Sequence, residues 1–301
     1  MGVQLNIFEC GGIGIGVCTT HKISDALSFM RFVNFWAAIA RGDKNLVAPQ
    51  FGSAELFPPR DLGGFDVNIF NPVLSPKETI ITKRFVFTAS KIGEIREKYS
   101  DKTSSSENPT RPTRIEALSA FMWNRFAAAT KLSPDTLCTI THMINLRTRT
   151  EPPLPEHSVG NLFTWAMTVP SMDNTGESCH NLIAEIRESI RKIDNEFVKR
   201  LQDGYSPTNN IMEILANHDA KREILSFTFT SLCRFPRYEA DFGWGKPIWA
   251  SSCARDMKNV VSFMDTATGN GVEAWVSLNE EDMAKLEYDK EFLAYISPTS
   301  F

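Results

Sequence analysis

The sequence has no large excess of either charge. Its 301 residues include 32 Lys and Arg against 36 Asp and Glu, giving a formal net charge of -4. Because there is no basic field to attract nucleic acid, small-molecule chemistry fits the chain better than polymer binding. The six cysteines include no Cys-x-x-Cys pair, so neither a zinc spacing nor a small disulfide scaffold is indicated. We expect free thiols and no metal site.

Long apolar runs are also missing from the sequence. No segment approaches the roughly 18 apolar residues that a membrane-spanning helix needs. Residues 1–9 lack the basic and apolar regions of a signal peptide. We therefore expect a soluble, cytoplasmic protein without a membrane partner. The apolar content of 42% and the chain length predict one large or two medium folded domains.

Hydrophobic periodicity predicts strands and helices that interleave along the chain, which indicates an α/β protein with mixed sheets. Prolines and glycines dominate residues 47–77 and indicate a linker between two lobes. Thr113 and Glu116 have the spacing of a helix capping box. We expect strands at 3–8, 13–18, 79–88, 137–147, 223–231, 260–264 and 272–278. We expect helices at 24–41, 113–132 and 180–202, and a short helix that follows the strand at 79–88 and ends at Tyr99.

His21 is the first candidate for chemistry. It lies between a predicted strand and a predicted helix, where a side chain can reach a pocket. A neutral imidazole there can accept a proton from an attacking alcohol, although a lone histidine is more often structural than catalytic. Asp25 follows four residues later. It either orients His21, if both lie in the helix, or points away and pairs with a cation that fixes the loop.

The second candidate is the segment Asp241-Phe242-Gly243-Trp244-Gly245. Glycines on both sides of a tryptophan allow a backbone path that is closed to other residues, and the two aromatic rings can anchor it. Asp241 is either a second catalytic carboxylate or a buried salt-bridge partner.

Taken together, these motifs resemble those of the BAHD acyltransferases, plant enzymes that move an acyl group from coenzyme A to an alcohol or amine. The branch that acetylates alkaloids and terpenoids is the most similar, and the resemblance covers the whole chain. The residues that carry it are His21 to Asp25, Asn145 to Arg147 with Pro152 to Pro155 and Gly160-Asn161, Arg234 to Pro236 with Tyr238 to Pro247, and Gly271 to Val276 with Glu280 to Met283.

The resemblance implies a two-lobed, chloramphenicol-acetyltransferase-like α/β fold with mixed sheets. Residues 1–51, with 241–260 returning to them, form part of the first lobe. Residues 52–75 link the lobes, and residues 76–240 and 261–301 form the second lobe. Only about twenty residues precede His21, whereas the family has a long segment there. We therefore expect an incomplete first lobe with exposed apolar side chains.

For function, the resemblance implies an O-acyltransferase that moves an acyl group, with acetyl the expected one, to a hydroxyl of a plant specialised metabolite. Acyl-CoA is then a co-substrate rather than a bound cofactor, and the protein is a monomer. The alternatives are a truncated, catalytically inactive fragment and an N-acyltransferase that acts on an amine.

The resemblance also assigns roles to the motif residues. His21 is the general base, and Asp25 is structural and pairs with Arg147. Asp241 is named with the histidine as catalytic in the family, but a structural role is favoured for its loop, which includes Gly243 and Trp244.

Three further residues are candidate binding residues. Thr113 and Arg114, at a helix amino terminus, are the candidate contacts for coenzyme A phosphates, and an ordinary cap with a solvated arginine is the alternative. Arg234 occupies a position that faces the acceptor in some relatives, so it is a candidate for acceptor specificity.

Overall fold

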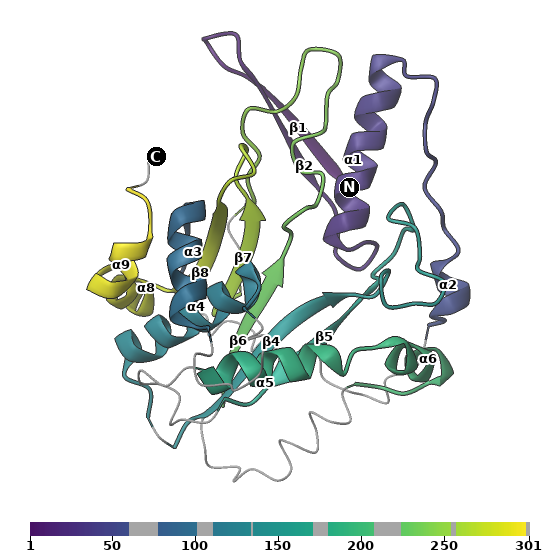
Figure 1. Ribbon diagram of the computed structural model, residues 1–301. Coiled ribbons are helices and arrows are strands. Elements are labelled where there is room, and N and C mark those ends of the chain that lie inside the picture. The colour runs from purple at the N-terminus through teal and green to yellow at the C-terminus, as the bar shows by residue number, and fades with distance from the viewer. Residues whose placement is uncertain are drawn as a thin grey trace. The chain divides into compact units, whose positions relative to one another are not determined.

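The computed structural model describes residues 1–59, 78–100, 111–133, 135–170, 180–207, 224–253 and 257–298 (Figure 1). The chain divides into two compact units. The first unit comprises Met1–Arg60, Asn145–Phe163 and Phe235–Ala250. The second comprises Asp61–Ile144, Thr164–Arg234 and Ser251–Phe301. Among the described residues, no helix is long and apolar enough to cross a membrane.

The second unit is built on a six-stranded mixed sheet with the strand order β3-β8-β7-β6-β4-β5. β4 pairs parallel with β6 and β6 with β7, whereas β8 pairs antiparallel with both β7 and β3. The α/β organisation with a mixed sheet is therefore as predicted. The strands are β3 (Ile80–Phe87), β4 (Leu137–Asn145), β5 (Phe163–Thr168), β6 (Ile224–Ser231), β7 (Val260–Asp265) and β8 (Val272–Asn279).

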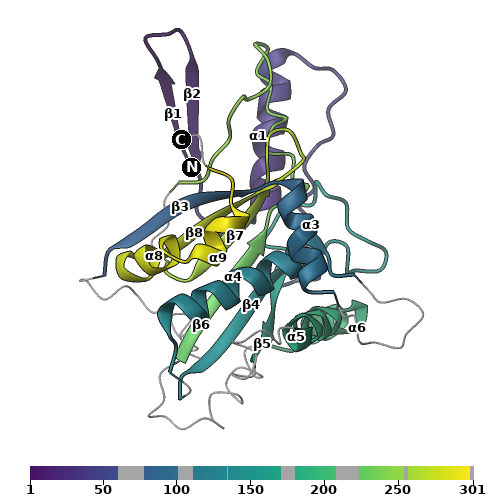
Figure 2. The same ribbon diagram turned by 60° about the vertical axis from the view of Figure 1, so that its left-hand side comes forward.

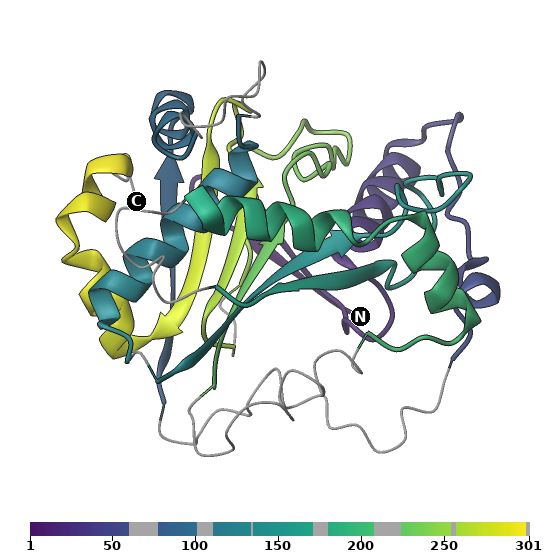
Figure 3. The ribbon, with the colours of Figure 1, turned by 60° about the horizontal axis from the view of Figure 1, so that its bottom comes forward.

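Helix α4 (Arg114–Thr130) packs on one face of this sheet (Figure 2). The predicted capping box is present, since the Thr113 hydroxyl accepts from the Glu116 N–H at 3.2 Å and the Glu116 carboxylate accepts from the Thr113 N–H at 2.9 Å. Helices α3, α5, α8 and α9 contribute to the same apolar core (Figure 3). Their bounds are α3 (Ala89–Lys98), α5 (His180–Arg191), α8 (Glu280–Glu287) and α9 (Lys290–Tyr295).

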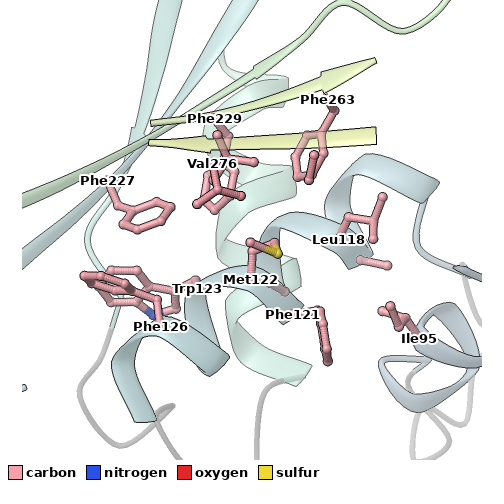
Figure 4. Close-up of a cluster of buried hydrophobic side chains, with 14 of the residues drawn as sticks. Ile95, Leu118, Phe121, Met122, Trp123, Phe126, Phe227, Phe229, Phe263 and Val276 are labelled. Atoms are coloured by element: carbon pink, nitrogen blue, oxygen red, sulfur yellow. The ribbon is translucent and has the colours of Figure 1, made fainter. Parts of the chain in front are cut away.

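The core of the second unit is strongly aromatic (Figure 4). The Phe227 ring of β6 contacts the buried rings of Trp123 and Phe126 on α4. Phe229 lies beside Phe227 and stacks on Phe263 of β7, so the aromatic contacts continue across the sheet. Burying each such side chain contributes about 1.5–3 kcal/mol relative to exposure. The stability of this unit therefore rests on packed apolar area.

The predicted helix over residues 180–202 is wrong in one respect, because two helices occupy it. α5 ends at Arg191, and α6 (Asn195–Asp203) begins after Asp194. The Asp194 carboxylate accepts from the Phe197 N–H at 2.8 Å. A side chain that caps a new helix competes with continuation of the previous one.

The first unit contains a hairpin, a long helix and the short helix α2 (Ser53–Leu56). β1 (Gly2–Ile7) pairs antiparallel with β2 (Ile13–Cys18), and helix α1 (Ala26–Arg41) follows. Val3, Leu5 and Ile7 of the hairpin are exposed. Two loops complete the unit, one of which forms a parallel bridge from Ser158 to Gln50.

This division differs from the predicted lobes. Residues 145–163 belong to the first unit rather than the second, because they hydrogen-bond to the start of α1. Residues 251–260 belong to the second, where Val260 opens β7 and pairs with β6 and β8. Within the predicted linker, Ser53–Leu56 form the short helix α2, and residues 60–75 lie outside the described ones.

Candidate active site

His21 lies in a turn between β2 and α1 and is exposed. The Ile23 N–H closes this turn by donating to the Thr20 carbonyl at 3.1 Å. α1 begins only at Ala26, so His21 is outside the helix and helical spacing does not place Asp25 beside it. The dyad reading, which required both residues in one helix, is therefore not supported by the local geometry.

Asp25 is the buried N-cap of α1, with 7% of its surface exposed. Its Oδ1 accepts from the Ser28 N–H at 2.9 Å, and its Oδ2 accepts from the Leu162 N–H at 3.0 Å. Arg147 donates to both oxygens, from Nη1 to Oδ2 at 2.8 Å and from Nη2 to Oδ1 at 3.1 Å. The expected ion pair with Arg147 is present, and it turns the carboxylate away from solvent.

Arg147 is buried even more completely, with 1% of its surface exposed. Besides Asp25, its guanidinium donates to the Ser158 carbonyl at 2.9 and 3.2 Å, to the Ser28 hydroxyl at 2.9 Å and to the Asn145 side chain at 3.2 Å. Taking two charges out of water costs several kcal/mol per ion, and paired charges with satisfied hydrogen bonds offset that cost. The network therefore fixes the chain immediately after His21.

Residues 160–163 complete the surroundings of His21. The Asn161 side-chain amide donates to the His21 carbonyl at 2.6 Å. The Phe163 ring meets the His21 imidazole edge to face, with the ring centroids 5.5 Å apart. Sequence reasoning missed both contacts. The one sequence feature that pointed to this region was the Gly160-Asn161 pair, which is among the motifs that carry the family resemblance.

The loop Asp241–Gly245 is a closed structure of its own. Asp241 Oδ1 accepts from the N–H groups of Gly243 and Gly245 at 2.8 and 2.9 Å. These bonds hold the pKa of the Asp241 carboxyl below its usual value. Both glycines have φ above +100°, a conformation that side chains disfavour. Trp244, which is 63% exposed, stacks on Phe242.

This loop is attached to the far end of α1 from His21. Phe242 packs edge to face on Trp36, with centroids 4.8 Å apart, and Arg41 donates to the Asp241 carbonyl at 2.6 Å. Because α1 has 16 residues, its ends are separated by about 24 Å. His21 precedes one end and Arg41 ends the other, so the two motifs do not share one set of reacting atoms.

In the second unit, one carboxylate joins two of the candidate binding residues. Arg114 donates to Asp265 Oδ1 at 3.0 Å, and the Arg234 N–H donates to Asp265 Oδ2. Arg114 is thus ion-paired rather than simply solvated. Arg234 is exposed and has a positive φ of 67°. No group of three metal-binding side chains occurs in the described ranges, and the five cysteines described there are free thiols.

Comparison with known proteins shows the family. The family model named "Transferase family" matches residues 1–293, and the chain belongs to this family, that of the BAHD acyltransferases. It is 37% identical to limonoid 21-O-acetyltransferase of Melia azedarach over 98% of its own length and 67% of that protein. It is 35% identical to stemmadenine O-acetyltransferase of Catharanthus roseus over 96% of its length and 64% of that protein.

Solved structures support the same assignment. The crystal structure of vinorine synthase matches with a TM-score of 0.76 and 32% identity, over 98% of this chain and 65% of that one. TRI101 of F. sporotrichioides, solved with coenzyme A and T-2, matches with a TM-score of 0.71 at 18% identity, which supports the fold alone. The predicted chloramphenicol-acetyltransferase-like fold is confirmed. The chain spans about two thirds of the length of these relatives.

Proposed function

We propose that the chain is an acyl-CoA-dependent O-acyltransferase that moves an acetyl group to a hydroxyl of a plant specialised metabolite. The relatives named above are O-acetyltransferases of a limonoid and of stemmadenine. One observation carries the proposal: an exposed histidine is held at the start of α1 by the buried Asp25–Arg147 pair. A fixed base is what acyl transfer to an alcohol needs.

His21 acts as the general base in this reaction. Its imidazole accepts the proton of the acceptor hydroxyl as that oxygen attacks the thioester carbonyl. The tetrahedral intermediate then expels the coenzyme A thiolate, which takes the proton from the imidazolium. The acyl group passes directly to the acceptor, so the protein supplies no nucleophile.

The other motif residues act through structure or binding. Asp25 and Arg147 hold the turn that carries His21, and Asp241 with Gly243 and Trp244 shapes a loop. Acyl-CoA is a co-substrate. Thr113 and Arg114 remain the candidate contacts for its phosphates, which an arginine can bind by charge-assisted hydrogen bonds.

The proposal also concerns which acceptor the chain acylates. Arg234 remains the candidate for acceptor specificity, and the N–H of its positive-φ backbone donates to Asp265. An amine acceptor is the alternative to a hydroxyl. The monomeric state and cytoplasmic location stay predictions from the sequence.

The test is acetyl transfer by the chain and by three variants. Purified chain, His21→Ala, His21→Gln and a His157→Ala control are incubated with acetyl-CoA and a panel of terpenoid and alkaloid alcohols and amines. Thiol release and product mass are followed. We expect turnover by the chain and the control, and a loss of about 100-fold or more in both His21 variants.

Three outcomes would contradict the proposal. Equal thiol release by the chain and the His21 variants would remove the base assignment. Acetylated amines without acetylated alcohols would favour N-acylation. A folded chain that shows no turnover on any acceptor would favour the inactive alternative, and acetyl-CoA binding measured by calorimetry would show whether it still binds the donor.

A further inference from the structure

Residues 160–163, here called the 160–163 strap, lie along the segment from His21 to Asp25. Each of the four residues contacts either His21 or Asp25. The Gly160 carbonyl accepts from the Asp25 N–H at 3.2 Å. Asn161 binds the His21 carbonyl, and the Leu162 N–H binds the Asp25 carboxylate. The Phe163 ring lies against the His21 imidazole. All of these residues belong to the first unit.

We propose that Asn161 and Phe163 are positioning residues for His21. This inference rests on the proposed function, since it assigns them the task of orienting the base. Asn161 fixes the main chain of His21 and so sets the direction of its Cα–Cβ bond. Phe163 borders the imidazole and limits the rotamers that the ring adopts. An exposed side chain in a turn has few other constraints, so these two contacts decide where the base points.

The contacts of the 160–163 strap divide into two kinds. The backbone groups of Gly160 and Leu162 bond to the buried Asp25, where their loss would affect folding. The side chain of Asn161 is exposed, and its bond reaches His21 instead. Exposed hydrogen bonds contribute little net stability because water replaces them. Removing the Asn161 side chain is therefore expected to change the reaction rate more than the stability.

The kinetic test uses Asn161→Ala, Phe163→Leu and Phe163→Tyr. Small displacements of a reacting group can lower rates by about 100-fold, so we expect kcat to fall at least about 10-fold in Asn161→Ala and Phe163→Leu. KM for acetyl-CoA and acceptor should change less than about 3-fold, because neither residue is assigned to binding. Phe163→Tyr keeps the ring and should retain most of the wild-type kcat.

Asn34→Ala is the matched control. Its side-chain amide also donates to a backbone carbonyl in the first unit, that of Pro236, at 2.9 Å. The variant therefore removes the same type of bond away from His21, and its kcat should stay within about 2-fold of wild type. A kcat loss in Asn161→Ala that is matched by Asn34→Ala, or by an equal loss of folded protein, would overturn the inference.

A second readout does not depend on turnover. The chain has five histidines, so the imidazole signals in a histidine-labelled sample can be resolved by NMR, and His21→Ala identifies that of His21. We expect this signal to shift in Asn161→Ala and Phe163→Leu and to stay in place in Asn34→Ala. If the chain shows no turnover, the proposed function fails while this shift still decides the positioning. An unmoved His21 signal in both strap variants would overturn it.

Discussion

Two aspartate–arginine pairs at opposite ends of α1 use the same chemistry in different surroundings. Asp25 and Arg147 are buried at the start of the helix. Asp241 and Arg41 lie at its end with side chains that are 27% and 35% exposed, and their closest charged atoms are 3.5 Å apart. In both pairs the aspartate also accepts from backbone N–H groups.

Burial is what separates their roles. When one partner of a buried pair is removed, no water can solvate the charge that remains. Removing either partner alone is therefore strongly destabilising. A partly exposed pair is screened by solvent and contributes little. The loop at Asp241 depends instead on two glycines with positive φ and on aromatic contacts with α1. The sequence presents both motifs as conspicuous aspartates, but only Asp25 belongs to the network that holds the candidate base.

The largest expected effect comes from breaking the buried pair. Arg147→Met leaves Asp25 buried without a countercharge, which should lower the free energy of unfolding by about 3–5 kcal/mol. Urea or thermal unfolding followed by circular dichroism measures the loss. The double variant Asp25→Leu/Arg147→Met removes both charges and should recover part of the lost free energy of unfolding. The recovery is incomplete because Asp25 is also the N-cap of α1. A double variant no more stable than the single one would show that the unpaired charge is not the cause.

An acid titration extends the comparison to the second unit. His142 is 4% exposed and stacks on Phe229, and burial lowers the pKa of its imidazole to about 4, although the Glu116 charge partly opposes this. The His142 imidazole binds a proton more readily in the unfolded chain than in the folded one. Neutral His142 therefore contributes its full share of stability above about pH 6.5, and this share is lost as the pH falls toward 4. The loss amounts to about 3 kcal/mol at most.

His142→Phe should therefore flatten the fall in stability between pH 6.5 and 4, measured by urea unfolding at several pH values. Asp241 provides the contrast. The N–H groups of Gly243 and Gly245 lower the pKa of the Asp241 carboxyl. Asp241 therefore contributes to stability at pH values above the ordinary aspartate pKa of about 4, and this contribution is lost only as the pH falls below that value. An unchanged pH dependence in His142→Phe would exclude His142 as the source.

The smallest effect is expected at Asp241. Asp241→Asn keeps an oxygen that can accept from the two glycine N–H groups and removes only the charge, so melting temperature and kcat should stay close to wild type. Asp241→Ala also removes the acceptor and should lower the melting temperature further, though less than Arg147→Met does. A folded Asp241→Asn protein that has lost turnover would make Asp241 catalytic and reverse the comparison.

Local patterns in the sequence predicted most of the elements. Alternation and helical periodicity located β1, β2, α1 and five of the six strands of the second sheet, but not β5 (Phe163–Thr168), and the spacing of Thr113 and Glu116 predicted the observed capping box. The break after Arg191 was missed, because both helices continue one apolar pattern and only the Asp194 cap separates them.

The sequence by itself determined the family, most of the strands and longer helices, and the identity of the candidate base. The tertiary structure decided which way each motif residue points. Arg147 is 122 residues from Asp25 in the chain, and Asn161 is 140 from His21. No local pattern specifies such pairs, because they form only when folding brings distant backbone segments together and removes water from between them.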